Sequence, residues 1–96
     1  MHVLIRRYTL AGSGAELLRR AKEDDIIPTI RALPGFRAYH IAECGGRGIM
    51  SIGFWDSKAA ANRSTELARQ WVHRSAIGLV PYPPELLEGD TLIDIT

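Results

Sequence analysis

The sequence has little of several features that would each point to a class of protein. It contains one cysteine, Cys44, so no disulfide can form within the chain. The formal net charge is +1, and so small an excess argues against strong attraction to nucleic acid or to a membrane surface. No apolar run approaches the roughly 18 residues of a membrane span. We therefore expect no nucleic-acid partner and no membrane partner.

The residues that carry chemistry are also scattered. No group of His, Cys, Asp or Glu has metal-ligand spacing, so no metal site is predicted. Residues 1–7 run directly into a strand-like pattern and lack a basic-then-apolar signal layout, which favours a cytoplasmic location. The composition, 46% hydrophobic and 24% charged, is typical of a globular protein, and 96 residues correspond to one domain, 1–96.

The first third of the chain predicts a strand followed by a helix. Residues 2–9 are rich in β-branched and aromatic side chains, as strands are. Ser13 and Glu16 have the spacing of a capping box, which predicts a helix that ends before Pro34. Pro28 lies inside this helix and removes a backbone donor, so we expect a kink or break there.

The remainder predicts two strands, a second helix and a last strand. Residues 36–43 and 49–55 are strand-like and are joined by a glycine-rich hairpin turn. Residues 56–57 cap a helix that is predicted to run to about Leu79. A stiff proline-rich connection follows, and the last strand is predicted over residues 91–95.

This order of elements is the split arrangement of a ferredoxin-like α+β domain, βαββαβ. Two helices should cover one face of a four-stranded antiparallel sheet. The other face also looks apolar, because Val3 and Ile5 alternate with Leu4, and Ile52 alternates with Trp55 along its strand. An apolar face without helices needs a partner, so we predict a homodimer that stacks sheet on sheet as a dimeric α/β barrel.

Two stretches flank the second and third strands in a distinctive way. Residues 33–36 read Leu-Pro-Gly-Phe, and residues 54–60 read Phe-Trp-Asp-Ser-Lys-Ala-Ala. With these stretches the chain resembles the antibiotic biosynthesis monooxygenase-like group of dimeric α/β barrel proteins. The later runs 68–72, 83–85 and 88–90 are similar to a subset of short members with no assigned activity.

The resemblance implies one of two chemistries. One is the oxidation of electron-rich phenols or anthrone-like rings by O₂ without a cofactor, and the other is the binding and oxidative opening of haem. In such members an Asn and a Trp, sometimes with a His, line a pocket between sheet and helices. Here the first strand offers Arg6, Arg7 and Tyr8 but no Asn, and Ser64 stands near the position of the haem-branch Trp. Both catalytic sets are therefore incomplete in this chain.

Trp71 and His73 form a pair that can line a catalytic or haem pocket. Successive helical residues turn by about 100°, so these two side chains diverge by about 200°. Trp71 shares its side with Leu67 and is expected in the core or in a pocket wall. His73 lies beside Arg69 and Arg74 and is expected in solvent or at an interface.

His40 is the stronger candidate for a catalytic residue. It falls on the same alternating face of its strand as Phe36, and that face is predicted to lie against the helices. A histidine among small side chains there would serve as a proton acceptor or as a hydrogen-bonded structural residue. Tyr39 is then expected on the opposite face, as an interface aromatic.

The resemblance therefore implies, as the first of two function classes, a cofactor-independent monooxygenase that acts on a small aromatic phenol or quinol. His40 would be the base, Trp71, Phe54 and Phe36 would be apolar walls, and Asn62 would be a polar contact. A non-catalytic dimeric module that binds a small ligand, or whose cavity is filled, is the alternative, and haem binding is the weaker one. A second copy and a small aromatic ligand are the expected partners, and no cofactor is expected.

Overall fold

The structure, a computed structural model, describes residues 1–95. Its elements along the chain are β1 (His2–Thr9), α1 (Gly14–Glu23), α2 (Ile26–Arg31), β2 (Phe36–Glu43), β3 (Gly48–Trp55), α3 (Lys58–Trp71), the π-helical turn η1 (Val72–Ala76) and β4 (Glu85–Asp90). None of the helices within residues 1–95 is long and apolar enough to cross a membrane.

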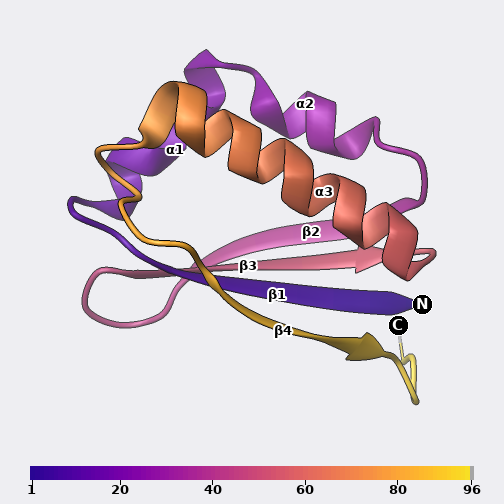
Figure 1. The fold of residues 1–96 in the computed structure, drawn as a ribbon. Coiled ribbons are helices and arrows are strands. Elements are labelled where there is room, and N and C mark those ends of the chain that lie inside the picture. Colours follow the sequence, from indigo (N-terminus) through magenta and orange to yellow (C-terminus); the bar gives the residue numbers. More distant parts are fainter. Residues whose placement is uncertain (96) are drawn as a thin grey trace.

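The strands form one sheet in the order β2-β3-β1-β4, and each neighbouring pair is antiparallel. Helices α1, α2 and α3 form a layer over one face of this sheet, as Figure 1 shows. We call this side the helix face and the uncovered side the open face. The α+β ferredoxin-like fold predicted from the order of elements is confirmed.

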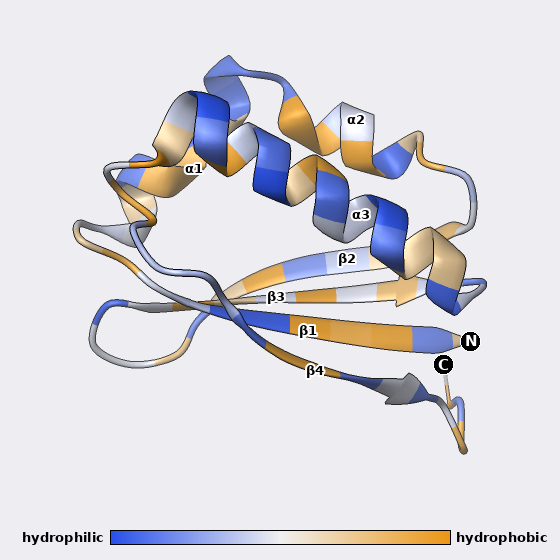
Figure 2. Cartoon of the chain, viewed as in Figure 1, coloured by the Kyte–Doolittle hydropathy of each residue, from blue (hydrophilic) through white to orange (hydrophobic). Residues whose placement is uncertain are grey.

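Alternation along the strands assigns each side chain to a face. On the helix face, Leu4, Ile49 and Trp55 are buried in the core, which continues into the apolar sides of the helices (Figure 2). The pairing places a second apolar set on the open face: Val3, Ile5, Ala38, Ala42, Met50, Ile52, Phe54 and Leu87. The sheet therefore has two apolar faces, as the sequence predicts.

The helices begin at the predicted capping residues. The hydroxyl of Ser13 accepts from the backbone N–H of Glu16 at 3.2 Å, and the hydroxyl of Ser57 accepts from that of Ala60 at 3.1 Å. The carboxylate of Glu16 binds Arg19 and Arg20 instead of turning back to the cap. These ion pairs within one helical turn stabilise α1, and they take the place of the hydrogen bond from the Ser13 N–H to the Glu16 carboxylate that a full capping box would have.

The first predicted helix breaks three residues before the expected place. Helix α1 ends at Glu23, and Asp25 adopts a left-handed conformation with φ 56° before α2 starts at Ile26. Pro28 then lies in the first turn of α2, where backbone N–H groups have no intrahelical partner, so its missing donor does no harm. The prediction of a break at Pro28 was wrong in position.

The last strand is not at the predicted residues 91–95. Strand β4 is Glu85–Asp90, which pairs along β1 as far as His2 opposite Asp90. Beyond that pair, the N–H of Thr91 donates to the carbonyl of Met1, and residues 91–95 form no strand. Backbone pairing with an inner strand therefore decided the position of β4, although its sequence is less strand-like than the apolar run that follows.

His2 joins β4 to β1 through an ionisable contact. Its Nε2 lies 2.9 Å from Glu88 Oε1 and its Nδ1 lies 3.1 Å from Asp90 Oδ1, and the residue is buried. The hydrogen bond to Glu88 is the largest cause that raises the pKa of His2 above 6.5. Folding therefore favours the protonated imidazole.

We expect this contact to make stability depend on pH. Because the pKa of His2 is higher in the folded state, its contribution is complete below about pH 6.5 and is lost as pH rises through the raised pKa. The urea midpoint should be lower at about pH 8.5 than at about pH 5.5. This difference should shrink in His2→Gln and persist in His73→Gln, since His73 is exposed. An unchanged difference in His2→Gln would assign it to another group.

Candidate functional site

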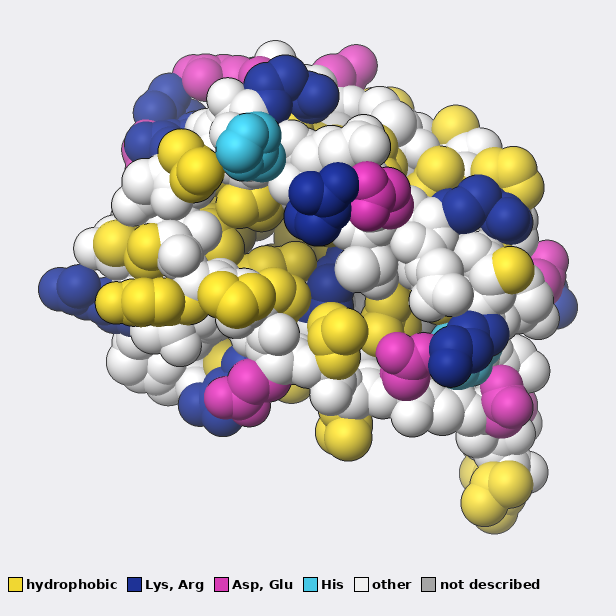
Figure 3. All heavy atoms as spheres, in the orientation of Figure 1, with side chains coloured by type: hydrophobic (Ala, Val, Ile, Leu, Met, Phe, Trp, Pro, Cys, Tyr) yellow, Lys and Arg dark blue, Asp and Glu magenta, His cyan; other side chains and the backbone are white. Residues whose placement is uncertain are grey.

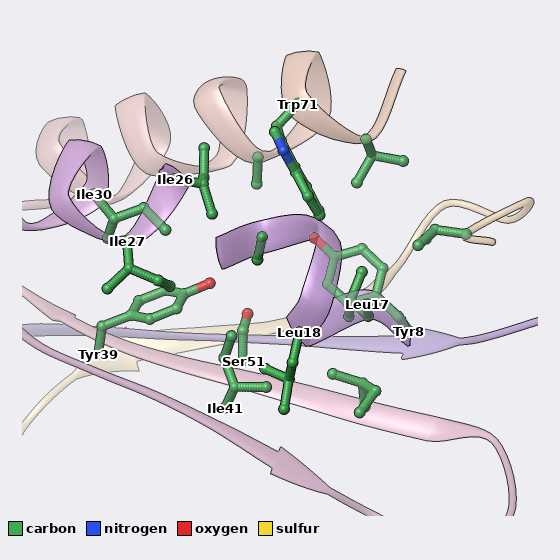
Figure 4. Close-up of a pocket in the computed structure, with 15 residues that line it drawn as sticks. Tyr8, Leu17, Leu18, Ile26, Ile27, Ile30, Tyr39, Ile41, Ser51 and Trp71 are labelled. Atoms are coloured by element: carbon green, nitrogen blue, oxygen red, sulfur yellow. The ribbon is translucent and has the colours of Figure 1, made fainter. Parts of the chain in front are cut away.

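A small cavity, which we call the inner cavity, lies between the helix layer and the sheet. Its volume is about 60 Å³. In Figure 4, Trp71 descends from α3 while Tyr8 and Tyr39 rise from the sheet. The lining residues are Tyr8, Leu17, Leu18, Ala21, Ile26, Ile27, Ile30, Tyr39, Ile41, Ile49, Ser51, Ala68, Trp71, Val72 and Val80. Benzene needs a cavity of roughly 150 Å³, so the inner cavity alone is too small for an aromatic ring.

Trp71 is held in place by a hydrogen bond across the helix layer. Its Nε1 donates to Asp24 Oδ2 at 2.7 Å, and only 6% of the residue is exposed. Hydrogen bonds from Ser75 and then from Trp71 lower the pKa of the Asp24 carboxyl, which keeps this acceptor charged. The indole is therefore a fixed wall of the inner cavity, with its polar atom directed away to Asp24.

The polar groups of the inner cavity are hydroxyls. They belong to Tyr8, Tyr39 and Ser51. Burial is the main cause that raises the pKa of Tyr8, so its phenol stays protonated at neutral pH and can donate a hydrogen bond. No His, Asp or Glu among residues 1–95 lines the inner cavity. This cavity therefore offers hydrogen-bond donors but no carboxylate or imidazole base.

A larger pocket, the outer hollow, adjoins the inner cavity and opens to solvent. Its volume is about 410 Å³, within the range of roughly 300–1,000 Å³ that small-molecule sites occupy. It is lined by Arg6, Tyr8, Thr65, Arg69, Val72, His73, Ile77, Val80, Pro81, Tyr82, Pro83, Pro84 and Leu86. Figure 3 shows this side hollowed, with hydrophobic side chains at the walls. Three residues line both spaces: Tyr8, Val72 and Val80. The inner cavity and the outer hollow are therefore parts of one site.

Arg6 is the most unusual residue of this site. It lies on the helix face of β1 with 2% of its surface exposed. Its Nη1 donates to Thr65 Oγ1 at 3.1 Å and to Ser64 Oγ at 3.4 Å, and its Nη2 donates to Tyr39 Oη at 3.1 Å. Within residues 1–95, Arg6 has no carboxylate partner and its Nε–H has no acceptor.

Comparison with solved structures identifies the architecture around this site. A protein of unknown function from Nitrosomonas europaea, NE2512, has a TM-score of 0.78 at 17% identity, over 99% of this chain and 92% of that one. SnoaB, a cofactor-independent oxygenase from Streptomyces nogalater, has a TM-score of 0.72 at 14% identity, over 98% and 95%. The chain has the antibiotic biosynthesis monooxygenase fold.

A third structure with this fold carries a different chemistry. The heme-degrader MhuD from Mycobacterium tuberculosis, with two hemes bound in its active site, has a TM-score of 0.73 at 22% identity, over all of both chains. No protein-family model and no curated protein matches the sequence. The fold implied by the resemblance at residues 33–36 and 54–60 is confirmed, and these low identities carry no activity to this chain.

A β-bulge places His40 differently from the prediction. The register of β2 against β3 shifts between Phe36 and Ala38, so the extra residue reverses the alternation. Phe36 faces the helices, but His40 pairs with Ile52 on the open face and is exposed, with its ring 6.5 Å from that of Phe54. The prediction that His40 faces the helices was wrong.

The same bulge brings Tyr39 to the site. Tyr39 pairs with Gly53 on the helix face and lines the inner cavity, although the sequence predicted it on the opposite face. The extra residue, Arg37, is held by an ion pair with Asp56, 2.5 Å from Nε to Oδ1. Tyr39 thus exchanges places with His40, and the buried aromatic hydroxyl at the site comes from a residue predicted as an interface aromatic.

The structure brings one of the four predicted wall and contact residues into the inner cavity. Trp71 lines it, as predicted. Phe36 lines a neighbouring recess and packs edge-to-face on Trp55, with centroids 5.7 Å apart. Phe54 lies on the open face, and Asn62 is exposed on α3 and lines neither the inner cavity nor the outer hollow. Alternation along β3 accounts for Phe54, which neighbours the buried Trp55.

The predicted divergence of Trp71 and His73 holds in outline, but both residues border the site. Trp71 lines the inner cavity and His73, which is exposed, lines the outer hollow. The chain changes from α-helix to the π-helical turn η1 at Val72, between them. Such turns widen a helix locally and are frequent at functional sites.

Sequence reasoning missed Arg6 as a site residue, although a signal was present. Arg6 and Arg7 are neighbours in a strand, so one of the two must point toward the helices. The buried positions Leu4 and Ile49 identify the inward set, and Arg6 belongs to it by alternation. In the described part of the chain, no group of three or more His, Cys, Asp or Glu side chains is arranged to hold a metal ion.

Proposed function

We propose that this protein is an oxygenase that oxidises a small electron-rich phenol or anthrone-type ring with O₂ and without a bound cofactor. The observation that carries the proposal is the joined inner cavity and outer hollow, which are mostly apolar and together large enough for an aromatic ligand. The half-buried Tyr8 lies at their junction, and the half-buried Tyr39 lines the inner cavity. The fold of SnoaB, an oxygenase without a cofactor, supports it.

The reaction balances without an added reductant. An anthrone-type CH₂ group becomes C=O with one oxygen atom of O₂, and the other atom leaves with the two hydrogens as water. The substrate supplies all the electrons, so it must first be present as an electron-rich anion. Hydrogen-bond donors directed at its oxygen favour that anion.

Tyr39 is the residue best placed to favour the anion. Its oxygen accepts from Arg6 Nη2 at 3.1 Å, which leaves its own O–H free to donate and polarises it. Tyr8 adds a second buried phenol that stays protonated. The apolar side chains that line both spaces, Val72 and Val80, exclude water from the ring. His40 would have to act as a base from the open face.

Oxygen uptake by the purified, metal-free protein with hydroquinones and anthrone-type phenols tests this proposal. We expect uptake above the uncatalysed rate and a loss of about 10²-fold in Tyr39→Phe, the scale measured for removal of one donor from an oxyanion site. His40→Ala should largely keep the rate, because His40 lines neither the inner cavity nor the outer hollow. Loss of activity in His40→Ala would instead support His40 as the catalytic base.

Binding of the same compounds without uptake would favour the alternative, a non-catalytic ligand-binding module. Haem binding has less support from the site. His73 is the imidazole that lines the outer hollow, but it is exposed and makes no side-chain hydrogen bond within residues 1–95. A ligating histidine normally has its second ring nitrogen held by such a bond.

We also propose that the protein is a homodimer formed through the open face. Its apolar residues include Ile5 and Ile52, which pair on the two inner strands, and Phe54 next to them. A two-fold symmetric contact matches such a patch with itself, so a second copy supplies an apolar surface of the same shape. A sheet that packs on one face against helices needs this second cover when both faces are apolar.

A further inference from the structure

Arg6 carries a buried charge for which residues 1–95 supply no carboxylate partner. Its contacts are neutral hydroxyls of Ser64, Thr65 and Tyr39, and its Nε–H has no acceptor in residues 1–95. The guanidinium stays protonated in proteins. A buried charge without a paired anion destabilises a fold, so natural proteins rarely retain one without a use.

The other arginine of the outer hollow, Arg69, carries the same charge as Arg6. Among the side chains that line the outer hollow are Arg6, Arg69 and His73, and none of its lining residues is Asp or Glu. Arg69 is paired with Glu66 on the outer surface, but Glu66 does not line the hollow. A pocket with basic groups and no acid, bounded by low-dielectric apolar walls, concentrates anions.

The remaining walls are suited to a flat apolar body. Tyr8 and Tyr82 contribute aromatic rings, and residues 81–84 contribute three prolines and Tyr82 along one side. Proline and tyrosine present rigid surface that loses little conformational entropy on contact. The hollow therefore combines an anion-binding end at Arg6 with walls for an aromatic ring.

We infer that the outer hollow binds an aromatic carboxylate, with the carboxylate at Arg6 and the ring between Tyr8 and the 81–84 segment. A guanidinium binds a carboxylate through parallel N–H···O bonds, which a neutral phenol or amide cannot reproduce. The inference names the ligand class of the proposed oxygenase site and rests on that site, but the binding it predicts requires no turnover.

Binding of two redox-inert probes tests this inference. We choose 2-naphthoic acid and its uncharged amide, 2-naphthamide, because they have nearly the same shape. Isothermal titration at neutral pH and low salt should show the acid binding at least about tenfold more tightly, a difference typical of a charge-assisted contact. The preference should decrease as salt is added.

Substitutions test whether Arg6 causes the preference for the acid over the amide. In Arg6→Gln and Arg6→Met the acid should bind no more tightly than the amide. Arg63→Gln is the matched control, because it removes the same charge from an exposed residue of α3 that lines neither the inner cavity nor the outer hollow. Arg63→Gln should keep the preference of the natural chain.

A stability measurement separates a binding role from a structural one. A buried charge without a partner is costly to the fold, so replacing it with an apolar side chain of similar size should not lower stability. The thermal midpoint of Arg6→Met should therefore equal or exceed that of the natural chain. A drop of more than about 8 °C, which exceeds the shift that a modest loss of stability causes in a domain of this size, would identify Arg6 as a structural residue and overturn the inference.

Equal affinities for acid and amide, or no binding of either at millimolar concentration, would also overturn it. So would an acid preference that survives in both Arg6 variants. Because 2-naphthoic acid is not oxidised in this assay, the result is independent of oxygen uptake. If the protein binds the acid through Arg6 but consumes no oxygen, the proposed oxygenase function is rejected and the proposed anion site is supported.

Discussion

Trp55→Ala is expected to lower the free energy of unfolding by about 3–5 kcal/mol, the usual range for a fully buried tryptophan. Trp55 has 0% exposure and packs edge-to-face on Phe36 at an interplanar angle of 80°. Its indole lies over Gly53, where an added Cβ would come within 2.4 Å of Nε1. Gly53 has no side chain that can fill the space left by the indole, so the cavity would persist.

A loss of this size matters because small domains have total stabilities of only about 5–15 kcal/mol. Urea denaturation followed by far-ultraviolet circular dichroism measures it. Trp55→Phe keeps a ring against Phe36 and should lose less, and Tyr82→Ala removes an aromatic that is 65% exposed and should change stability by about 0.5 kcal/mol or less. Similar losses in Trp55→Ala and Tyr82→Ala would show that the core does not depend on the Trp55 contact.

Ile52→Asp is expected to separate the proposed homodimer into monomers. Ile52 lies on the open face in the middle of β3, opposite Ile5 on β1 and His40 on β2. In a sheet-on-sheet dimer the new carboxylate would be buried without a counter-charge, which is strongly unfavourable. We expect the dissociation constant to rise at least about 100-fold, which corresponds to about 2.7 kcal/mol.

Sedimentation equilibrium across micromolar concentrations measures this change. Ala32→Asp is the matched control, because Ala32 is exposed at the end of α2 in the helix layer, away from the open face. Circular dichroism of both variants checks that the fold is kept. A natural chain that is monomeric at these concentrations, or an Ile52→Asp variant that stays dimeric, would contradict the proposed interface.

Helix caps and strand patterns predicted the helix starts and strands well, because these features depend on residues that are close together in the sequence. Ser13 and Ser57 cap helices because their hydroxyls reach N–H groups three residues ahead, whatever the rest of the chain does. The strands 2–9, 36–43 and 49–55 follow from side chains that suit a pleated surface, and they agree with β1, β2 and β3 to within a residue. The order of these elements was enough to predict the ferredoxin-like fold.

The candidate site was less predictable, because one inserted residue in β2 decides which side chains of that strand face the helices. Arg37 occupies the bulge in β2, and its ion pair with Asp56 joins residues that are distant in sequence. Without the bulge, alternation from Phe36 places His40 toward the helices and Tyr39 away from them, which is the reverse of the structure. Strict alternation of side chains assumes that no residue is inserted, so every residue after Phe36 in this strand was assigned to the wrong face.

The sequence by itself determined the α+β fold, the helix starts and the two apolar faces of the sheet, because periodicity and capping act between residues a few positions apart. The tertiary structure alone decided three further features. It placed β4 at residues 85–90, where β1 offers backbone partners, and it brought Tyr39 inward through the bulge. It also buried Arg6 among hydroxyls of α3 and β2, contacts between residues 33 to 59 positions apart that no local pattern specifies.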